Sequence, residues 1–174
     1  PVLCHMAEDI WQNLPYAVPE RSVFERGWPT APASWRQPEL EPPMERIAAL
    51  RALVNRQLEN CRSGGQLGAS LEAQVQLELG AGEAAAATSA ALEWLAASVH
   101  PEVDNLADWL LVSALQQGGT AAEPVLAEAS EAGITVRIAK ADGQKCERCW
   151  HYETDIGQHA AHPSLCGRCV AVLA

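Results

Sequence analysis

The stretch CERCWHYETDIGQHAAHPSLCGRC, residues 146–169, contains two cysteine pairs, Cys146/Cys149 and Cys166/Cys169. Two residues separate the cysteines of each pair, and sixteen residues lie between the pairs. This spacing is typical of a structural zinc site built from four thiolates. A two-residue gap lets one tight turn direct two sulfurs at a single ion, and two such turns complete a tetrahedron with Zn–S bonds of about 2.3 Å. We therefore expect all four cysteines to bind one structural zinc ion, which would supply the folding free energy of a short, polar tail.

Other uses of paired cysteines compete with this interpretation. Disulfides are typical of secreted chains, but the first residues lack the basic and apolar regions of a signal peptide. A redox CxxC follows a strand in a βαβ pattern, which the sequence does not show. Iron in a rubredoxin-like site stays open as an alternative, because four sulfurs alone do not choose between iron and zinc. Three histidines between the pairs could replace a thiolate but are expected at the surface or beside the site: His151, His159 and His162.

Length and composition permit a packed core. The chain has 174 residues, 48% of them hydrophobic, which is enough for one ordinary domain or two small ones. No apolar run approaches the about 20 residues that span a bilayer, so we expect a cytoplasmic protein with no membrane segment. The chain opens inside an amphipathic helical pattern without an N-cap residue, which suggests that its first helix belongs to a larger protein.

The net charge of −10 is unevenly distributed. Residues 63–133 carry ten acidic residues and no basic one, whereas residues 46–62 carry four arginines against one glutamate. Residues 134–174 carry five basic residues against four acidic ones. A polyanion would be repelled by the middle of the chain and attracted to the two less acidic segments, so any nucleic-acid binding would be local.

The first third of the chain reads as a helix, an arm and a second helix. The opening helix should stop near Asn13, because a proline follows two residues later. Residues 15–43 hold seven prolines and are expected to form an extended arm fastened by Trp28 and Trp35. From 44 to 62, apolar residues recur every three or four positions and predict one buried helix face, ended by Gly64 and Gly65.

Three arginines of this helix lie outside the apolar stripe, and spacing alone predicts that they form a solvated face: Arg46, Arg51 and Arg56. Cys4 and Cys61 lie in apolar helical patterns, so we expect them to be small core residues rather than metal ligands.

The middle of the chain predicts a small α+β unit. Strict alternation over 71–79 indicates a strand with one wet face, and the alanine-rich segment 83–98 indicates a helix. A short helix over 101–108, a buried strand over 109–115 and a mobile loop over 118–130 should follow. A strand over 134–138 then leads to the first cysteine pair. The fold class is thus α+β with a C-terminal four-cysteine module.

Several strings together resemble the C-terminal region of bacterial isoleucyl-tRNA synthetases. They are LRALVNRQLENCRSGGQLGASLEAQVQLEL from Leu50, LLVSAL from Leu110, CERCWHY and CGRCV in the tail, and PVLCHMAEDIWQNLP with SVFERGWP near the start. The resemblance covers the whole chain. It implies the end of a helical anticodon-binding domain with its arm and arginine helix (1–62), a junction unit (63–139) and a zinc-binding module (140–174).

The family consists of class I aminoacyl-tRNA synthetases, which activate isoleucine with ATP and transfer it to tRNA. The HxGH and KMSKS signatures of the ATP site are missing from this sequence, so no residue here is expected to be catalytic. The resemblance implies a monomer whose C-terminal part binds the anticodon stem-loop, with tRNA and the remainder of the synthetase chain as partners. It places the arginine helix, Arg46, Arg51 and Arg56, and the zinc module near that stem-loop.

Trp150 directly follows the first cysteine pair, where a metal would hold the backbone. We expect it to stack on an unpaired base of the loop, with Arg148 and Arg168 on phosphates. Two alternatives stay open: Trp150 packs over the zinc core, and the two arginines offset the charge of the thiolates. A different class of function, a free-standing zinc ribbon that binds protein, also fits the acidic middle of the chain.

Overall fold

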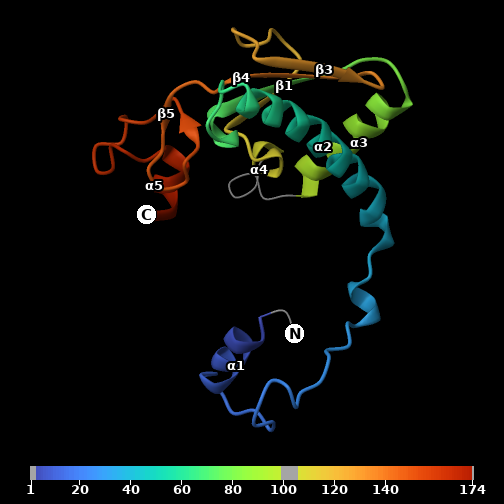
Figure 1. Cartoon of the computed structure of the whole chain (residues 1–174), viewed down its shortest axis with the longest axis vertical. Helices are drawn as coiled ribbons and strands as arrows, with labels where there is room; N and C mark the ends of the chain where they lie inside the picture. The colour runs from blue at the N-terminus through green and yellow to red at the C-terminus, as the bar shows by residue number, and fades with distance from the viewer. Residues whose placement is uncertain (1–2, 99–105, 174) are drawn as a thin grey trace. The chain divides into compact units, whose positions relative to one another are not determined.

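The computed structural model describes residues 3–98 and 106–173 (Figure 1). The chain divides into two compact units, Pro1–Pro38 and Glu39–Ala174. The second unit combines helices with a four-stranded sheet and carries the clustered cysteines, so the predicted α+β class is confirmed. Each helix among the described residues is too short or too polar to span a bilayer.

The first unit consists of helix α1 (Cys4–Gln12) and the proline-rich segment after it, which contains the 3-10 turn Ala33–Trp35. Glu8 holds this segment against the helix, since its carboxylate accepts hydrogen bonds from Ser22 Oγ at 2.8 Å and Val23 N at 3.1 Å. Trp28 and Trp35 expose 79% and 73% of their surface. The expectation that these two rings fasten the arm was therefore wrong, because backbone and hydroxyl donors do so instead.

Helix α2 (Glu41–Ser63) is the long helix of the second unit and follows the 3-10 turn Pro38–Leu40. It starts three residues before the predicted position, because prolines are tolerated in a first helical turn, where no N–H is needed. Gly65, with φ of +69°, supplies the left-handed residue after the helix, while Gly64 stays right-handed. The predicted apolar face, Ile47, Leu50, Val54, Leu58 and Cys61, is buried, and Leu53 is buried beside it.

The sheet contains β1 (Ala73–Leu79), β2 (Ala114–Gln117), β3 (Ala127–Glu131) and β4 (Ile134–Lys140), in the order β2-β1-β4-β3. The 3-10 turn Ser70–Glu72 precedes β1. β1 pairs in parallel with β2, and the other two pairings are antiparallel. Val75 lies between Leu115 and Ile138 in this register, so one face of the sheet is apolar.

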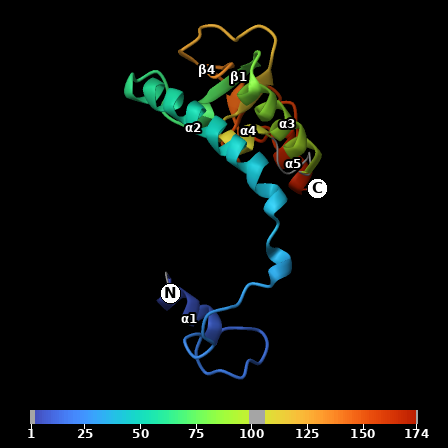
Figure 2. The ribbon, with the colours of Figure 1, turned by 90° about the vertical axis from the view of Figure 1, so that its right-hand side faces the viewer.

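Helices α2, α3 (Glu83–Ser98) and α4 (Leu106–Leu110) contact one another and cover the apolar face of the sheet (Figure 2). Leu50, Leu77, Leu110 and Ile138 come from four different elements and are 0–2% exposed. Each such side chain contributes about 1.5–3 kcal/mol by leaving water. This core positions α4 and the start of β2, on which the cysteine module lies.

Two predicted elements differ from the structure. Residues 109–115 do not form one strand: Trp109 and Leu110 end α4, Leu111 adopts a left-handed φ of 57°, and β2 begins at Ala114. The segment 118–130, predicted as a loop, contributes β3. Its residues AEASE lack the β-branched and aromatic side chains that signal a strand, and pairing with β4 stabilises it instead. The predicted helix over 101–108 lies outside the described residues up to 105.

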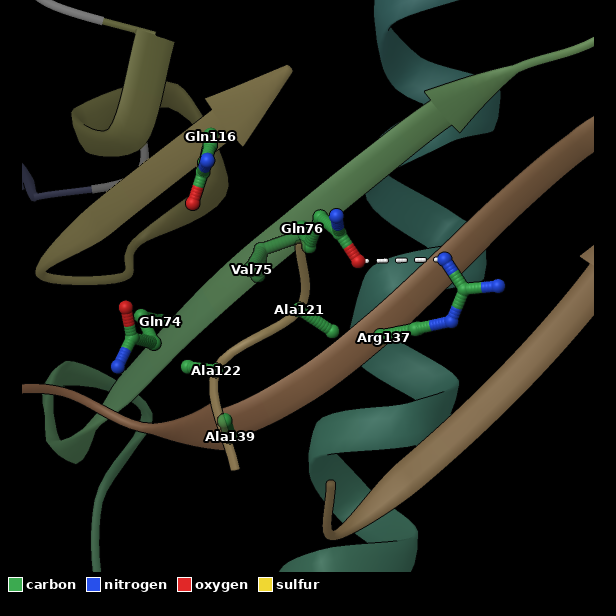
Figure 3. Close-up of a pocket in the computed structure, with 8 residues that line it drawn as sticks. All are labelled: Gln74, Val75, Gln76, Gln116, Ala121, Ala122, Arg137 and Ala139. Atoms are coloured by element: carbon green, nitrogen blue, oxygen red, sulfur yellow. Dashed lines mark hydrogen bonds between the residues drawn. The ribbon is translucent and has the colours of Figure 1, made fainter. Parts of the chain in front are cut away.

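The other face of the sheet carries polar side chains. Arg137 Nη1 donates to Gln76 Oε1 at 3.2 Å and to Glu78 Oε2 at 2.8 Å, and Arg137 Nε donates to Glu128 at 2.6 Å. Figure 3 shows a segment that crosses these strands, with Ala121 beside Gln76 and Arg137 and with Ala122 beside Ala139. The cavity that they line measures about 10 Å³, which is room for a single water and none for a substrate. This polar cluster is therefore structural.

Candidate metal centre and its surroundings

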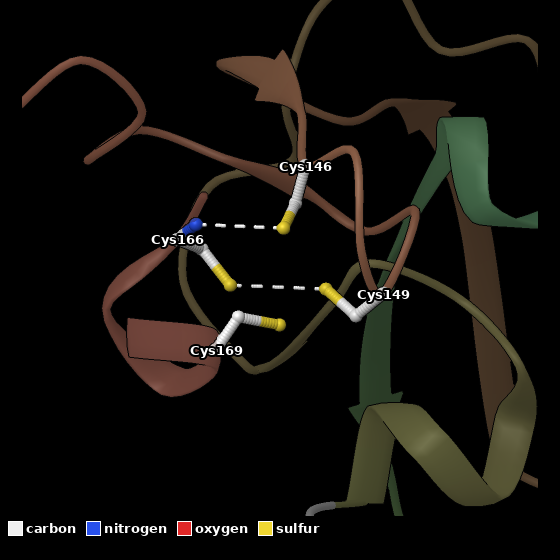
Figure 4. Close-up of side chains that lie close together, drawn as sticks. All are labelled: Cys146, Cys149, Cys166 and Cys169. Atoms are coloured by element: carbon white, nitrogen blue, oxygen red, sulfur yellow. Dashed lines mark hydrogen bonds between the residues drawn. The ribbon is translucent and has the colours of Figure 1, made fainter. Parts of the chain in front are cut away.

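The four paired cysteines come from two short segments of the tail (Figure 4). Cys146 and Cys149 lie in the turn between β5 (Gln144–Lys145) and β6 (Tyr152–Glu153). Within that turn, Cys146 N donates to His151 O at 2.8 Å and Trp150 N donates to Cys146 O at 3.0 Å. Cys166 precedes α5 (Gly167–Leu173), and Cys169 lies in its first turn.

The four Sγ atoms lie within 4.8 Å of one another. Cys149 Sγ and Cys166 Sγ are 3.7 Å apart. A tetrahedron with Zn–S bonds of about 2.3 Å has sulfur–sulfur edges of about 3.8 Å, so the four sulfurs fit one zinc ion. A disulfide would need about 2.05 Å, and all four thiols are free. The expected single structural zinc therefore has a site that matches its size and geometry.

The backbone around the cysteines favours thiolates at one end of the site. Burial raises the pKa of Cys146, but the backbone N–H groups of Cys149, Cys166 and Arg148 outweigh it and lower the pKa to about 6. Burial raises the pKa of Cys166. Arg148 Nη1 lies 3.7 Å from Cys169 Sγ, where its positive charge offsets thiolate charge. Ile156 and Leu165 are the main apolar side chains packed against the sulfurs, so the module has little core of its own.

The histidines between the pairs do not join the cysteine cluster within the described residues. His151 is 7% exposed, and its Nε2 lies 3.2 Å from Asp108 Oδ1 on α4. His159 Nε2 lies 3.1 Å from Asp155 Oδ2, which also accepts a hydrogen bond from Gly167 N at 2.7 Å. Both contacts lower the pKa of Asp155, that of His159 most. His159 therefore contacts the carboxylate that caps the start of α5, and His151 links the metal-binding turn to α4.

Trp150 projects from the first metal-binding turn with 59% of its surface exposed. Its φ is +69°, a left-handed conformation that a bulky residue rarely adopts. Lys145 Nζ lies 4.8 Å from the centre of the ring, within the range of a cation–π contact. A shallow hollow of about 50 Å³ lies alongside, lined in part by Leu71 and Tyr152. The module thus presents an aromatic face and a cation to solvent.

The predicted arginines lie in several places. Arg168 Nη1 donates to Asp108 Oδ2 at 2.8 Å, and 37% of its side chain stays exposed. On α2, Arg56 is exposed and pairs with Glu131 at 2.7 Å. Arg46 lines an open groove of about 460 Å³ between α2 and α3. Arg51 is half-buried on the same helix.

Comparison with known proteins adds the family context. Residues 143–172 match the family described as the zinc finger found in FPG and IleRS. The isoleucine–tRNA ligase of Prochlorococcus marinus strain MIT 9313 is 59% identical over 173 residues, which are 99% of this chain and 18% of that protein. Those of Parasynechococcus marenigrum strain WH8102 and Synechococcus sp. strain CC9311 are each 54% identical over 99% of this chain and 17% and 18% of their own lengths.

The chain matches isoleucine–tRNA ligases over nearly its whole length. The resemblance to isoleucyl-tRNA synthetases is thereby confirmed, and the zinc-finger match agrees with the geometry of the four sulfurs. The chain spans about a fifth of the length of these ligases.

Three residues around the metal centre were not singled out from the sequence. Lys145 directly precedes Cys146 and could have been found, because a cation beside an exposed tryptophan is a common nucleic-acid contact. Asp108 and Ser113 contact the tail from the α+β unit. They lie at least 39 positions away in sequence from the tail residues that they contact, so no local pattern pointed to them.

Proposed function

We propose that this chain is the tRNA-binding part of an isoleucine–tRNA ligase. It would hold the anticodon stem-loop of the isoleucine-accepting tRNA while parts of the enzyme outside this chain carry out ATP-dependent attachment of isoleucine. The enzyme would act as a monomer in the cytoplasm. The division expected from the sequence, 1–62, 63–139 and 140–174, is retained in this proposal. High identity to isoleucine–tRNA ligases along the chain supports it.

The observation that carries the proposal is the conformation of Trp150. A large exposed ring on a left-handed residue is unfavourable in itself, and such strain gathers at functional positions. The adjacent Cys149 would tie this residue to the metal, so the ring is presented on a rigid turn. Unstacked bases of an RNA loop bind such rings, and each stacked base is worth about 1–3 kcal/mol. We assign Trp150 to stacking on an anticodon-loop nucleotide.

Cations around the Trp150 ring would bind the phosphates of the RNA. Lys145 lies over the ring and is the nearest candidate. Arg148 and Arg168 are assigned as secondary contacts, because one lies against Cys169 and the other holds Asp108. The acidic segment 63–133 would repel the RNA backbone elsewhere and so restrict binding to the tail and α2.

The arginines of α2 form the second part of the proposed surface. Arg46 lies at the open groove beside α3, and Arg51 lies one to two turns further along the helix. The ion pair between Arg56 and Glu131 is exposed on both sides, and such pairs contribute little and exchange partners readily. All three arginines are therefore assigned to phosphate contacts.

Filter binding of an isoleucine tRNA transcript tests the proposal. We expect Trp150→Phe to keep most of the affinity and Trp150→Ala to lose about 5- to 100-fold, because a phenyl ring still stacks. One zinc per chain must remain in both variants. Trp35→Ala is the matched control, since this ring is also exposed but is not attached to a metal-binding turn. Loss of zinc in both Trp150 variants would show that the ring packs over the metal centre rather than stacking on an RNA base.

A salt series separates this function from a protein-binding zinc ribbon, the alternative that the acidic middle of the chain favours. Phosphate contacts release counterions, so the logarithm of affinity should fall linearly with the logarithm of salt concentration. No binding at low salt would overturn the tRNA proposal for this chain and favour the protein-binding alternative.

A further inference from the structure

One carboxylate of the α+β unit contacts both halves of the zinc module. Asp108 on α4 accepts a hydrogen bond from Arg168 Nη1 on its Oδ2, at 2.8 Å, and its Oδ1 lies 3.2 Å from His151 Nε2. The two partners belong to opposite halves of the metal site. His151 lies two residues after Cys149, and Arg168 lies between Cys166 and Cys169. Asp108 therefore joins both halves of the module to the same short helix.

The hydroxyl of Ser113, five positions after Asp108 in the sequence, makes a second attachment between the α+β unit and the module. Ser113 Oγ accepts a hydrogen bond from Tyr152 N at 2.8 Å and itself donates to Leu71 O. Ser113 is 9% exposed, so this bridge is shielded from water. Its partner Tyr152 directly follows His151. The two residues after Trp150 are thus held by two side chains of the α+β unit.

The contact of Asp108 with His151 is better shielded than an ordinary surface pair, whereas Arg168 keeps 37% of its side chain exposed. The side chain of Asp108 is 22% exposed and that of His151 is 9% exposed. Exposed ion pairs contribute little, whereas removing one partner of a shielded pair leaves a desolvated charge behind. The short segment 141–143, between β4 and β5, also joins the module to the sheet. Without Asp108, the module would lose the one side chain that contacts both halves of the metal site and would keep the Ser113 bridge.

We propose that Asp108 is a positioning residue that sets the orientation of the zinc module, and with it the direction of the Trp150 ring, relative to the α+β unit. This inference rests on the proposed function for its effect on tRNA. Asp108 itself does not contact RNA in this scheme. It acts through Arg168 and His151, and its loss leaves the four cysteines and their metal in place.

The sign of the effect makes the inference testable. Removing a negative charge from a protein that binds RNA should strengthen binding on electrostatic grounds alone. We expect the opposite for Asp108→Ala: affinity for the isoleucine tRNA transcript falls by about 5-fold or more, up to the loss caused by Trp150→Ala. Asp108→Asn keeps an oxygen acceptor for Arg168, so the affinity of this variant for the tRNA should fall less. Glu93→Gln on α3 is the control, because it removes an equal charge far along the chain from the module.

Non-additivity provides the second readout. If Asp108 acts through Trp150, the double variant Asp108→Ala/Trp150→Ala should bind tRNA no more weakly than Trp150→Ala alone. Zinc content, measured by elemental analysis, should stay at one per chain in all variants. Amide hydrogen exchange of the complete chain should show faster exchange at Tyr152 in both Asp108 variants and not in Glu93→Gln.

The outcomes separate the two proposals. If Trp150→Ala weakens tRNA binding while the Asp108 variants bind normally or more tightly, the positioning role is overturned and the function stands. If Trp150→Ala has no effect, the stacking function is overturned, and hydrogen exchange at Tyr152 alone decides whether Asp108 positions the module. Loss of zinc in Asp108→Asn would show a role in metal binding and would also overturn the inference.

Discussion

Lys145 Nζ lies 4.8 Å from the centre of the Trp150 ring, above the aromatic face that the first metal-binding turn exposes. The two residues come from the strand before the turn and from its end, so the turn itself brings them together. A cation over an aromatic ring combines the two elements that bind single-stranded RNA: a stacking surface and a phosphate partner.

Lys145→Gln should therefore weaken tRNA binding by about 3- to 10-fold and reduce the slope of log affinity against log salt by about one, since one phosphate contact is lost. Filter binding at several salt concentrations measures both quantities. Lys140→Gln removes the same charge from the end of β4 and should change them less. Equal effects of the two variants would contradict a specific role of Lys145.

Removal of zinc should unfold residues 143–172 and leave the four-stranded sheet intact. The buried part of the module consists of cysteines with few apolar neighbours, whereas the sheet has its own core with α2, α3 and α4. Apparent binding free energies of structural zinc are about 10–16 kcal/mol, more than such a small module gains from packing. Elemental analysis should give one zinc per chain, and NMR spectra before and after chelation should lose the tail signals alone. Loss of the sheet signals would show that the two parts fold as one.

Asp155→Ala should weaken zinc binding by about 3- to 5-fold, because the carboxylate that accepts from Gly167 N at the start of α5 is lost. Capping and charge effects at a helix start are worth about 0.5–1 kcal/mol. Competition with a chromophoric chelator measures the affinity. Asp142→Ala, an exposed acid in the turn before β5, serves as control and should leave it unchanged.

Because of Cys61, the stability of the α+β unit should fall at alkaline pH. Burial raises the pKa of its thiol above the ordinary value of 9.0, so the folded state disfavours the thiolate. This contribution to stability is complete below pH 9.0 and is lost as the pH rises from there through the folded pKa. Urea unfolding should show a smaller alkaline loss of stability in Cys61→Ala than in the unchanged chain. Cys4→Ala, in the other unit, should keep the full loss; the same loss in both variants would contradict the role of Cys61.

Alkylation gives an independent check on the same residue. Iodoacetamide should label the paired cysteines once zinc is removed, and Cys61 only after the α+β unit unfolds, because it is 0% exposed. Mass spectrometry of peptides identifies the labelled thiols.

Most of the elements were predictable from local patterns. The apolar stripe of α2, the alternation of β1 and β4 and the alanine-rich α3 each bury a face at the period expected for their type. The prediction failed where pairing or backbone conformation overrides propensity. β3 forms because β4 offers a partner edge, and Leu111 breaks the apolar run 109–115 with a left-handed turn between α4 and β2.

The metal site was predictable from the amino-acid sequence, because the spacing of Cys146, Cys149, Cys166 and Cys169 limits which ion geometry two tight turns can satisfy. The family resemblance was also predictable from the sequence. The surroundings of the site became visible in the folded chain alone: Lys145 lies over the exposed Trp150, and Arg168 and His151 contact Asp108. These contacts depend on the direction of individual side chains and on packing between residues up to 60 positions apart, which no local pattern encodes.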